Sequence, residues 1–192
     1  MIPSSKHTGE CSSAGGTSEL VERNALEALG RVLDELGIRW ALIGALAANR
    51  YRMTTRLTGD VDLLLANTGP GLAHLERALA AQGWSVQRAE PSGEILRLRH
   101  SELGVADLIV AATEYEGIAI TRAREETIGT DRIVRVATPE DVIVLKLIAG
   151  RAQDVADIEA ILTAKPVLDE AHIEEWAEFW DVLDLWRRLR DG

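Results

Sequence analysis

Residues 42–65 read LIGALAANRYRMTTRLTGDVDLLL, which is two apolar runs separated by a polar segment that contains arginine. The first run ends at Gly44, a pattern that predicts a short buried strand turning into a short helix. The second run, residues 60–66, predicts the next strand. Residues two apart in a strand point to the same side of the sheet, so we expect Asp60 and Asp62 to present their carboxylates together.

Two carboxylates this close repel each other unless a cation lies between them. Mg²⁺ prefers oxygen ligands, and it commonly binds one or two carboxylates together with the phosphates of a substrate. The pair Asp60 and Asp62 therefore predicts a metal site. A lone Asp-x-Asp at the start of a strand is also common without any function, so this interpretation depends on the rest of the chain.

A third acid, Asp107, interrupts the apolar run of residues 105–110. A carboxylate buried alone in such a strand is costly, so Asp107 requires a metal or a polar partner. If the strands are neighbours, Asp107 completes a triad with the first two carboxylates on one sheet face. The alternative interpretation is an ion pair between Asp107 and an arginine such as Arg97 or Arg99.

Apolar periodicity and turn residues elsewhere predict an α/β (α+β) fold, a small mixed sheet with flanking helices followed by a helical C-terminal part. Neither GxGxxG nor GxxxxGK[ST] is present, which argues against Rossmann and P-loop nucleotide sites. The further strands are expected at 84–88, 94–99, 104–110 and 133–136, and the helices at 18–36, 45–52, 72–82, 140–149, 154–162 and 170–189.

These elements predict three parts: a flexible N-terminal tail at 1–17, an α/β core at 18–137, and a helical part at 138–192 packed on the core. Aromatic residues in the last predicted helix recur at the helical period, and we interpret them as anchors on the core rather than as a base-stacking surface. They are Trp176, Phe179, Trp180 and Trp186, with Leu183 among them.

The chain has 192 residues, of which 46% are hydrophobic, and a formal net charge of -10. This balance argues against a broad basic surface that coats nucleic acid, and no DNA partner is expected, although a local basic groove stays possible. The single cysteine, Cys11, cannot form an internal disulfide, which fits a reducing compartment. No apolar run is long enough to span a membrane and the first 17 residues do not read as a secretory signal, so we expect a cytoplasmic protein without a membrane partner.

The order of strand, glycine, short helix, Asp-x-Asp and a later aspartate resembles the nucleotidyltransferase superfamily with the polymerase-β-like fold. The matching positions are Gly44, Asp60, Asp62 and Asp107. Ala45 departs from the pattern, because that superfamily usually has Ser or Gly there. The change removes a hydroxyl that could meet a phosphate, although backbone N–H groups at a helix start can still bind one.

A second stretch is similar to the AbiEii-type nucleotidyltransferases, and the resemblance covers about residues 38 to 162. It consists of Thr138-Pro-Glu-Asp141, Lys146-Leu-Ile-Ala149, Arg151-Ala-Gln-Asp154 and the run 157–162, with Arg56-Leu-Thr58 ahead of Asp-x-Asp. That group contains toxins of bacterial toxin–antitoxin pairs, including the mycobacterial MenT type, which attach nucleotides to tRNA acceptor ends.

The resemblance implies transfer of a nucleoside monophosphate from an NTP, such as ATP or CTP, to an acceptor hydroxyl with release of pyrophosphate. It implies that Asp60 and Asp62 bind Mg²⁺ or Mn²⁺, while Asp107 joins a second metal or helps to activate the acceptor. Lys146 would bind the triphosphate, unless it only forms a salt bridge with Asp141 or Asp154. The remaining implied site residues are Asp154, with Asp157 as a weaker candidate, and for the nucleotide Gly44, Ala45, Arg56 and Thr58.

The implied partners are tRNA, as the acceptor, and a cognate antitoxin protein. A basic patch for RNA could draw on arginines outside the motifs. Two alternatives stay open: nucleotidylation of a protein or of a small molecule such as an antibiotic, and a degenerate member that only binds a nucleotide or partner, which Ala45 favours. The arginines considered for the patch are Arg50, Arg52, Arg97, Arg99, Arg122 and Arg124.

Overall fold

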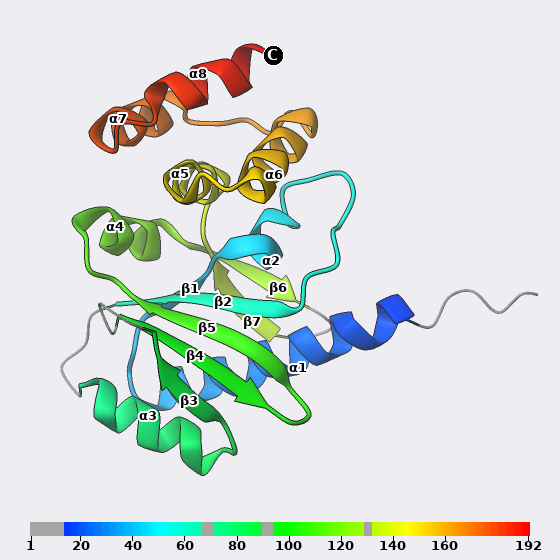
Figure 1. Cartoon of the computed structure of the whole chain (residues 1–192), viewed down its shortest axis with the longest axis vertical. Helices are drawn as coiled ribbons and strands as arrows, with labels where there is room; N and C mark the ends of the chain where they lie inside the picture. Colours follow the sequence, from blue (N-terminus) through cyan, green and yellow to red (C-terminus); the bar gives the residue numbers. More distant parts are fainter. Residues whose placement is uncertain (1–13, 67–70, 90–93, 129–131) are drawn as a thin grey trace, which may run out of the picture.

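The computed structural model describes residues 14–66, 71–89, 94–128 and 132–192, and side chains within it from residue 18. Within these residues the chain forms one mixed sheet of seven strands and eight helices (Figure 1). The strands are β1 (Trp40–Leu42), β2 (Asp60–Leu65), β3 (Ser85–Arg88), β4 (Ile95–His100), β5 (Gly104–Val110), β6 (Arg124–Ile128) and β7 (Arg132–Val136). The helices are α1 (Ala14–Glu35), α2 (Gly44–Ala48), α3 (Leu72–Ala81), α4 (Glu114–Arg122), α5 (Pro139–Ala149), α6 (Ala152–Thr163), α7 (Glu170–Phe179) and α8 (Leu183–Asp191).

The strand order in the sheet is β3-β4-β5-β2-β1-β7-β6. The pairs β2–β5 and β1–β7 are parallel, and the other neighbouring pairs are antiparallel. Helices α1 and α3 lie on one side of the sheet, whereas α2, α4 and the C-terminal helices lie on the other (Figure 1). This arrangement confirms the predicted small mixed sheet with flanking helices and a helical C-terminal part.

Strand β2 is buried on both faces beyond Asp62, which explains its continuous apolar run from Leu63 to Leu65. The apolar stripe of α1, centred on Leu29 and Leu33, covers the side opposite to α2 and is fully buried. Strands β2 and β5 are neighbours, the condition on which the expected approach of Asp107 depended, and their pairing puts Asp62 opposite Asp107.

Two elements were not predicted. Helix α4 begins with a capping box in which the Thr113 hydroxyl and the Glu116 carboxylate bond each other's backbone N–H groups. Strand β6 is a polar edge strand whose only pairing is with β7, so its sequence has no apolar alternation to reveal it.

The helix predicted over 170–189 is wrong as a single helix, because the chain breaks between α7 and α8. Asp181 adopts φ 58° at the break, a left-handed conformation that a helix cannot contain. The predicted anchoring of the aromatic residues holds for only part of the set. Trp186 is fully buried and Trp176 packs against Tyr115, while Phe179 is 70% exposed.

The division into tail, core and helical part stays a prediction. Residues 1–13 of the expected tail, including Cys11, lie outside the described residues. Helix α1 begins at Ala14, earlier than the expected start at residue 18, and the Ser18 hydroxyl donates to the Glu22 carboxylate inside the helix. Among the described residues, no helix is both long and apolar enough to cross a membrane.

Candidate active site

Gly44 joins β1 to α2 and lies directly against Asp62. Its φ of +67° is unfavourable for any residue with a side chain. A Cβ at this position would lie 2.7 Å from Asp62 Cγ and would overlap its Oδ2 atom. The Ile43 N–H also donates to the Asp62 carbonyl at 3.0 Å. Glycine is therefore the residue that lets the β1–α2 turn approach the Asp62 carboxylate.

The predicted carboxylates meet on the sheet face that carries α2. Asp60 and Asp62 alternate with buried Val61 along β2, and Asp107 on β5 is the direct cross-strand neighbour of Asp62. The pKa of Asp62 is raised to about 6, chiefly by burial and in addition by the negative charges of Asp107 and Asp60. A carboxylate in these surroundings is stabilised in its charged form by a cation.

Asp107 already has a cationic partner. Both of its oxygens accept from the Arg97 guanidinium, at 3.1 and 3.2 Å, in a bidentate ion pair. The ion pair between Asp107 and Arg97, which the sequence left open as an alternative to a metal, is therefore present. Within the described residues no group of three or more acidic, His or Cys side chains is arranged to hold a metal ion.

The chemistry of Asp60 and Asp62 fits Mg²⁺ or Mn²⁺, because both supply the hard oxygen atoms that these metals prefer. Two carboxylates are enough for a metal that takes its other ligands from water and substrate phosphates. The metal role of these residues and of Asp107 stays a prediction.

A buried cluster of cations and carboxylates lies in the C-terminal helices. Lys146 on α5 is 6% exposed, and its Nζ donates to Asp154 Oδ1 at 3.1 Å and to Asp157 Oδ2 at 2.7 Å. The salt bridge to Asp154 that was considered for Lys146 is therefore present, and Asp157 gives a second and shorter one. Asp154 also accepts from Arg151 at 2.6 Å.

Asp157 is the centre of this cluster. Besides Lys146, it accepts from Arg52 at 2.7 Å and from Arg56 at 3.3 Å, two residues of the segment that follows α2. Burial raises the pKa of Asp157, but its bonds and charges from Lys146 and Arg56 outweigh burial and hold the pKa below its usual value. From the sequence we expected Asp157 to be a weaker site candidate than Asp154, because the residues around Asp157 do not reveal that two distant arginines bind it.

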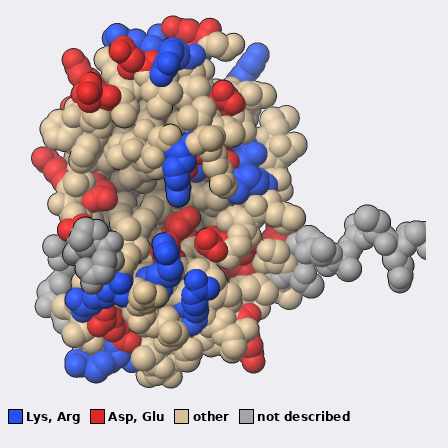
Figure 2. Space-filling view, in the orientation of Figure 1, with Lys and Arg blue, Asp and Glu red and all other residues tan. Residues whose placement is uncertain are grey.

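The cation cluster faces the carboxylates of the sheet. Four cationic side chains share the two carboxylates of Asp154 and Asp157, which leaves an excess of positive charge; they are Arg52, Arg56, Lys146 and Arg151. The charges of Lys146 and Arg151 act on Asp62 and lower its pKa against burial. On the face seen in Figure 2, acidic side chains lie near the middle with Lys and Arg on either side. Such a site can bind a metal on one wall and phosphates on the other.

A model of the family described as "Nucleotidyl transferase of unknown function (DUF2204)" matches residues 22–182, most of the chain. The chain belongs to this family. It is therefore a nucleotidyl transferase, as the strand, glycine and Asp-x-Asp pattern implied. A search of curated proteins finds no match to it.

Solved structures of other nucleotidyltransferases share the fold of this DUF2204 protein. An antigenic nucleotidyltransferase-like protein from Paracoccidioides brasiliensis is 18% identical with a TM-score of 0.57, over 90% of this chain and 94% of that one. The antibiotic-resistance factor ANT(2'')-Ia is 15% identical with a TM-score of 0.60, over 88% and 97%. The lincosamide antibiotic adenylyltransferase LnuA, bound to lincomycin, is 13% identical with a TM-score of 0.51, over 73% and 96%.

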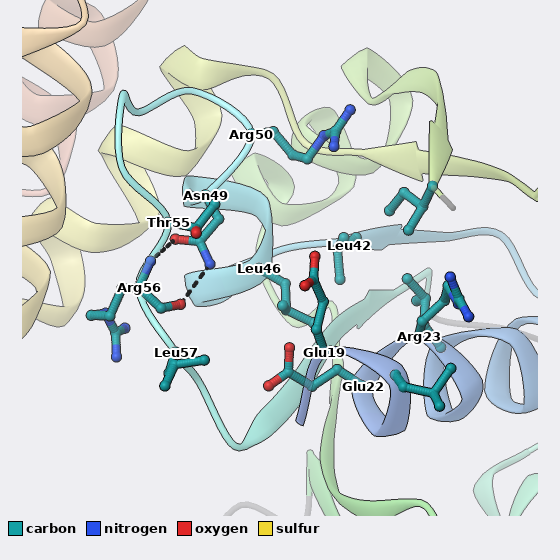
Figure 3. Close-up of a pocket in the computed structure, with 13 residues that line it drawn as sticks. Glu19, Glu22, Arg23, Leu42, Leu46, Asn49, Arg50, Thr55, Arg56 and Leu57 are labelled. Atoms are coloured by element: carbon teal, nitrogen blue, oxygen red, sulfur yellow. Dashed lines mark hydrogen bonds between the residues drawn. The ribbon is translucent and has the colours of Figure 1, made fainter. Parts of the chain in front are cut away.

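The Asn49 side chain fixes the backbone of Arg56. The Asn49 side chain donates to the Arg56 carbonyl at 2.8 Å and accepts from the Arg56 N–H at 3.0 Å, as Figure 3 shows. This fixes the backbone, while the guanidinium reaches Asp157. The hydroxyl of Thr58, the other expected nucleotide contact, makes long 3.4 Å bonds to the backbone of Asp60. Ala45 is 9% exposed within α2.

A cavity of about 490 Å³ lies beside this segment, between α1 and α2 (Figure 3). Its lining mixes leucines with charged side chains, which are two glutamates of α1 and three arginines, and Glu22, 8% exposed, is the more buried of the two glutamates. The lining residues are Glu19, Leu20, Glu22, Arg23, Leu26, Leu42, Leu46, Asn49, Arg50, Thr55, Arg56, Leu57 and Ile128.

The six arginines considered for a basic patch do not form one surface. Arg50 pairs with Glu126, Arg52 with Asp157, and Arg122 with the buried Asp141. Each of these arginines serves a different carboxylate. Arg97 and Arg99 do lie together, two residues apart on the open face of β4.

Proposed function

We propose that this protein transfers a nucleoside monophosphate from an NTP to a hydroxyl group, with Mg²⁺ or Mn²⁺ bound at Asp60 and Asp62. The observation that carries this proposal is the facing pair of walls, with carboxylates of β2 and β5 on one side and the Lys146–Arg151 cluster on the other. Family membership supports the reaction class.

In the proposed reaction the acceptor oxygen attacks the α-phosphorus of the NTP. A new P–O bond forms, the bond from the α-phosphorus to the bridging oxygen breaks, and pyrophosphate leaves with the electron pair. The metal would stabilise charge on the phosphate oxygens. Lys146 and Arg151 stabilise the departing pyrophosphate, and Asp107 is the carboxylate placed to take the hydroxyl proton once Arg97 releases it.

Incorporation of label from an α-³²P NTP tests the site. Asp60→Asn and Asp62→Asn are expected to lose transfer by more than about a hundredfold, because charge stabilisation by a metal contributes several kcal/mol. Asp184→Asn, an exposed acid on α8, is the matched control and should retain full transfer. Full transfer by both site variants would refute the assignment.

The acceptor we propose is the 3′ end of tRNA, with the protein acting as the toxin of a toxin–antitoxin pair. Support comes from the block that resembles AbiEii-type enzymes: Lys146, Arg151, Asp154 and Asp157 form a single bonded cluster, as a functional block should. Incubation with each labelled NTP and total tRNA should label a tRNA-sized product. Growth arrest on expression, relieved by a neighbouring small reading frame, would support the toxin role, whereas growth unaffected by active enzyme would contradict it.

A second candidate acceptor is a small molecule, and the cavity beside Arg56 favours it. A space of about 490 Å³ lined by leucines together with glutamate and arginine side chains suits a small amphipathic molecule. Sizing the product formed from labelled NTP and cell extract separates the candidates, because a small-molecule product stays in the low-mass fraction.

A further inference from the structure

The sheet face that carries Asp62 and Asp107 is open to solvent along β4. Along β4, Leu96 and Leu98 are fully buried on the side of α1 and α3, while Arg97 and Arg99 alternate with them and are exposed. On β3, Gln87, the cross-strand neighbour of Arg97, is exposed too. The sheet thus continues beyond the active-site carboxylates as a polar surface.

The strand register puts this surface in line with the active site. Asp62 on β2 lies opposite Asp107 on β5, and Asp107 lies opposite Arg97 on β4. The next row holds Asp60, then Val105, then Arg99. Two rows of side chains therefore lead from the carboxylates that we assign to the metal directly to two exposed guanidinium groups.

The Arg97 guanidinium can pair either with Asp107 or with a phosphate group. Its bidentate bonds to Asp107 are made by a side chain that is 50% exposed, so water competes with them and the pair is readily broken. A guanidinium fork matches the oxygens of a phosphate as well as it matches a carboxylate. A phosphate group near β4 could therefore replace Asp107 as the partner of Arg97.

We propose that Arg97 and Arg99 bind phosphodiester groups of the acceptor strand, and that this contact withdraws Arg97 from Asp107. The inference rests on the proposed nucleic-acid acceptor and adds how that acceptor prepares the site. Release of Asp107 leaves its negative charge next to Asp62 without a counter-ion. Acceptor binding then strengthens cation binding, and linkage requires that the cation strengthens acceptor binding equally.

The charge of the acceptor explains why such a coupling is useful. The whole chain has a net charge of -10, which repels a polyanion. Arg97 and Arg99, exposed on the sheet face, give the acceptor RNA a local positively charged binding site beside the carboxylates. The ion pair with Arg97 offsets the charge of Asp107 until a phosphate competes for the guanidinium.

Two binding measurements without NTP test the proposal. The first is fluorescence anisotropy with a labelled single-stranded RNA that ends in CCA, and the second is titration of Mn²⁺ followed by electron paramagnetic resonance. Arg97→Gln and Arg99→Gln should each weaken RNA binding roughly tenfold and reduce its salt slope by about one. Arg97→Gln should also bind Mn²⁺ several-fold more tightly than the wild type does.

Arg88→Gln is the matched control. Arg88 is an exposed arginine on β3 that makes a bidentate ion pair with Glu76, at 2.6 and 3.1 Å, on the opposite face of the sheet. This variant should leave both affinities unchanged. RNA should tighten Mn²⁺ binding by the wild type and by Arg88→Gln, but not by Arg97→Gln.

Three results would overturn the proposal. Wild-type RNA affinity in Arg97→Gln and Arg99→Gln would refute the docking surface while leaving the tRNA acceptor intact. Weaker Mn²⁺ binding by Arg97→Gln would show that Arg97 supports the carboxylates instead of competing for Asp107. Failure of the wild type itself to bind RNA, with NMP transfer to another acceptor, would refute both the acceptor class and this inference.

Discussion

At the scale of single residues, the approach of Gly44 to Asp62 is the tightest constraint in the active site. The glycine combines a left-handed backbone with a position where a Cβ would overlap the carboxylate. Turning the Asp62 side chain does not relieve the overlap, because the added Cβ would also lie 2.8 Å from Asp62 Cβ. Any larger residue must therefore move either the turn or Asp62.

We expect Gly44→Ala to destabilise the fold by about 1–3 kcal/mol, because it adds both backbone strain and overlap. Transfer activity should fall by at least about tenfold, since displacing a reacting group by about 1 Å has a large effect on rate. Urea denaturation and label incorporation measure the two effects. Gly59→Ala is the control, because a Cβ at Gly59 meets nothing within 4 Å; an equal loss in both variants would contradict the explanation.

The ionisation of Asp62 predicts a pH dependence. Burial and the neighbouring Asp107 and Asp60 raise its pKa from 3.8 to about 6 in the folded state. The folded protein thus retains a proton that the unfolded chain loses, so stability falls as pH rises between about 4 and about 6 and stays low above that range. Replacement of Asp62 by an uncharged side chain should therefore restore the stability that is lost above about pH 6.

We therefore expect Asp62→Asn to be more stable than the wild type at pH 7.5, by about 1–3 kcal/mol, with the difference disappearing near pH 4. In the wild type, Mn²⁺ affinity should rise between pH 5 and pH 7 as Asp62 ionises. Denaturation at both pH values and Mn²⁺ titration measure these effects. A stability difference that does not change with pH would contradict the assigned pKa shift.

At the residue scale, part of the site was predictable and part was not. Gly44, Asp60 and Asp62 follow from a contiguous pattern, since strand periodicity alone puts the two carboxylates on one side. Asp157 differs, because its partners Arg52 and Arg56 are about a hundred positions away and only the packed fold brings them near. Sequence spacing contains no information about such a contact.

At the scale of elements, Asp157 joins three parts of the chain. Its carboxylate on α6 holds Lys146 of α5 and two arginines of the segment between α2 and β2. Asp154 on the same helix bonds Lys146 and its neighbour Arg151 only. Loss of Asp157 therefore releases the Arg52 and Arg56 guanidinium groups, whereas loss of Asp154 leaves both bonded.

We expect Asp157→Asn to cost about 2–4 kcal/mol of unfolding free energy, because it leaves buried cations without a counter-charge. Asp154→Asn should cost less, about 1–2 kcal/mol, since Lys146 keeps Asp157 and Arg151 is exposed. Urea denaturation of the two variants provides the comparison, and hydrogen exchange at residues 50–57 should rise only in Asp157→Asn. The reverse order of stability would refute the central position of Asp157.

The unpredicted elements have separate causes. Helix α4 does have a signal, since Thr113 and Glu116 match the capping box. Strand β6 has none, because a polar edge strand is defined by its partner β7. The break at Asp181 contains neither glycine nor proline, and the apolar residues keep the helical spacing across it, so the sequence does not reveal the break.

At the scale of the whole molecule, the proposed active site draws on two layers, the sheet and the C-terminal helices, which lie next to each other in Figure 1. The carboxylates come from β2 and β5, and the cations come from α5, α6 and the segment after α2. A metal–nucleotide complex that contacts both walls would connect these layers. Its binding should therefore stabilise the whole fold and not one element.

We expect Mg²⁺ together with a non-hydrolysable NTP analogue, at about a hundred times its dissociation constant, to add about 2.7 kcal/mol to the unfolding free energy. For a chain of 192 residues this is a rise in Tm of about 5–10 °C. EDTA should remove most of the rise, because the metal joins the nucleotide phosphates to Asp60 and Asp62. Asp60→Asn/Asp62→Asn should lose the dependence on Mg²⁺, whereas Lys146→Met should lose the response to nucleotide. An equal shift in the wild type with and without EDTA would mean that the nucleotide binds outside the carboxylate wall, which would contradict the proposed site.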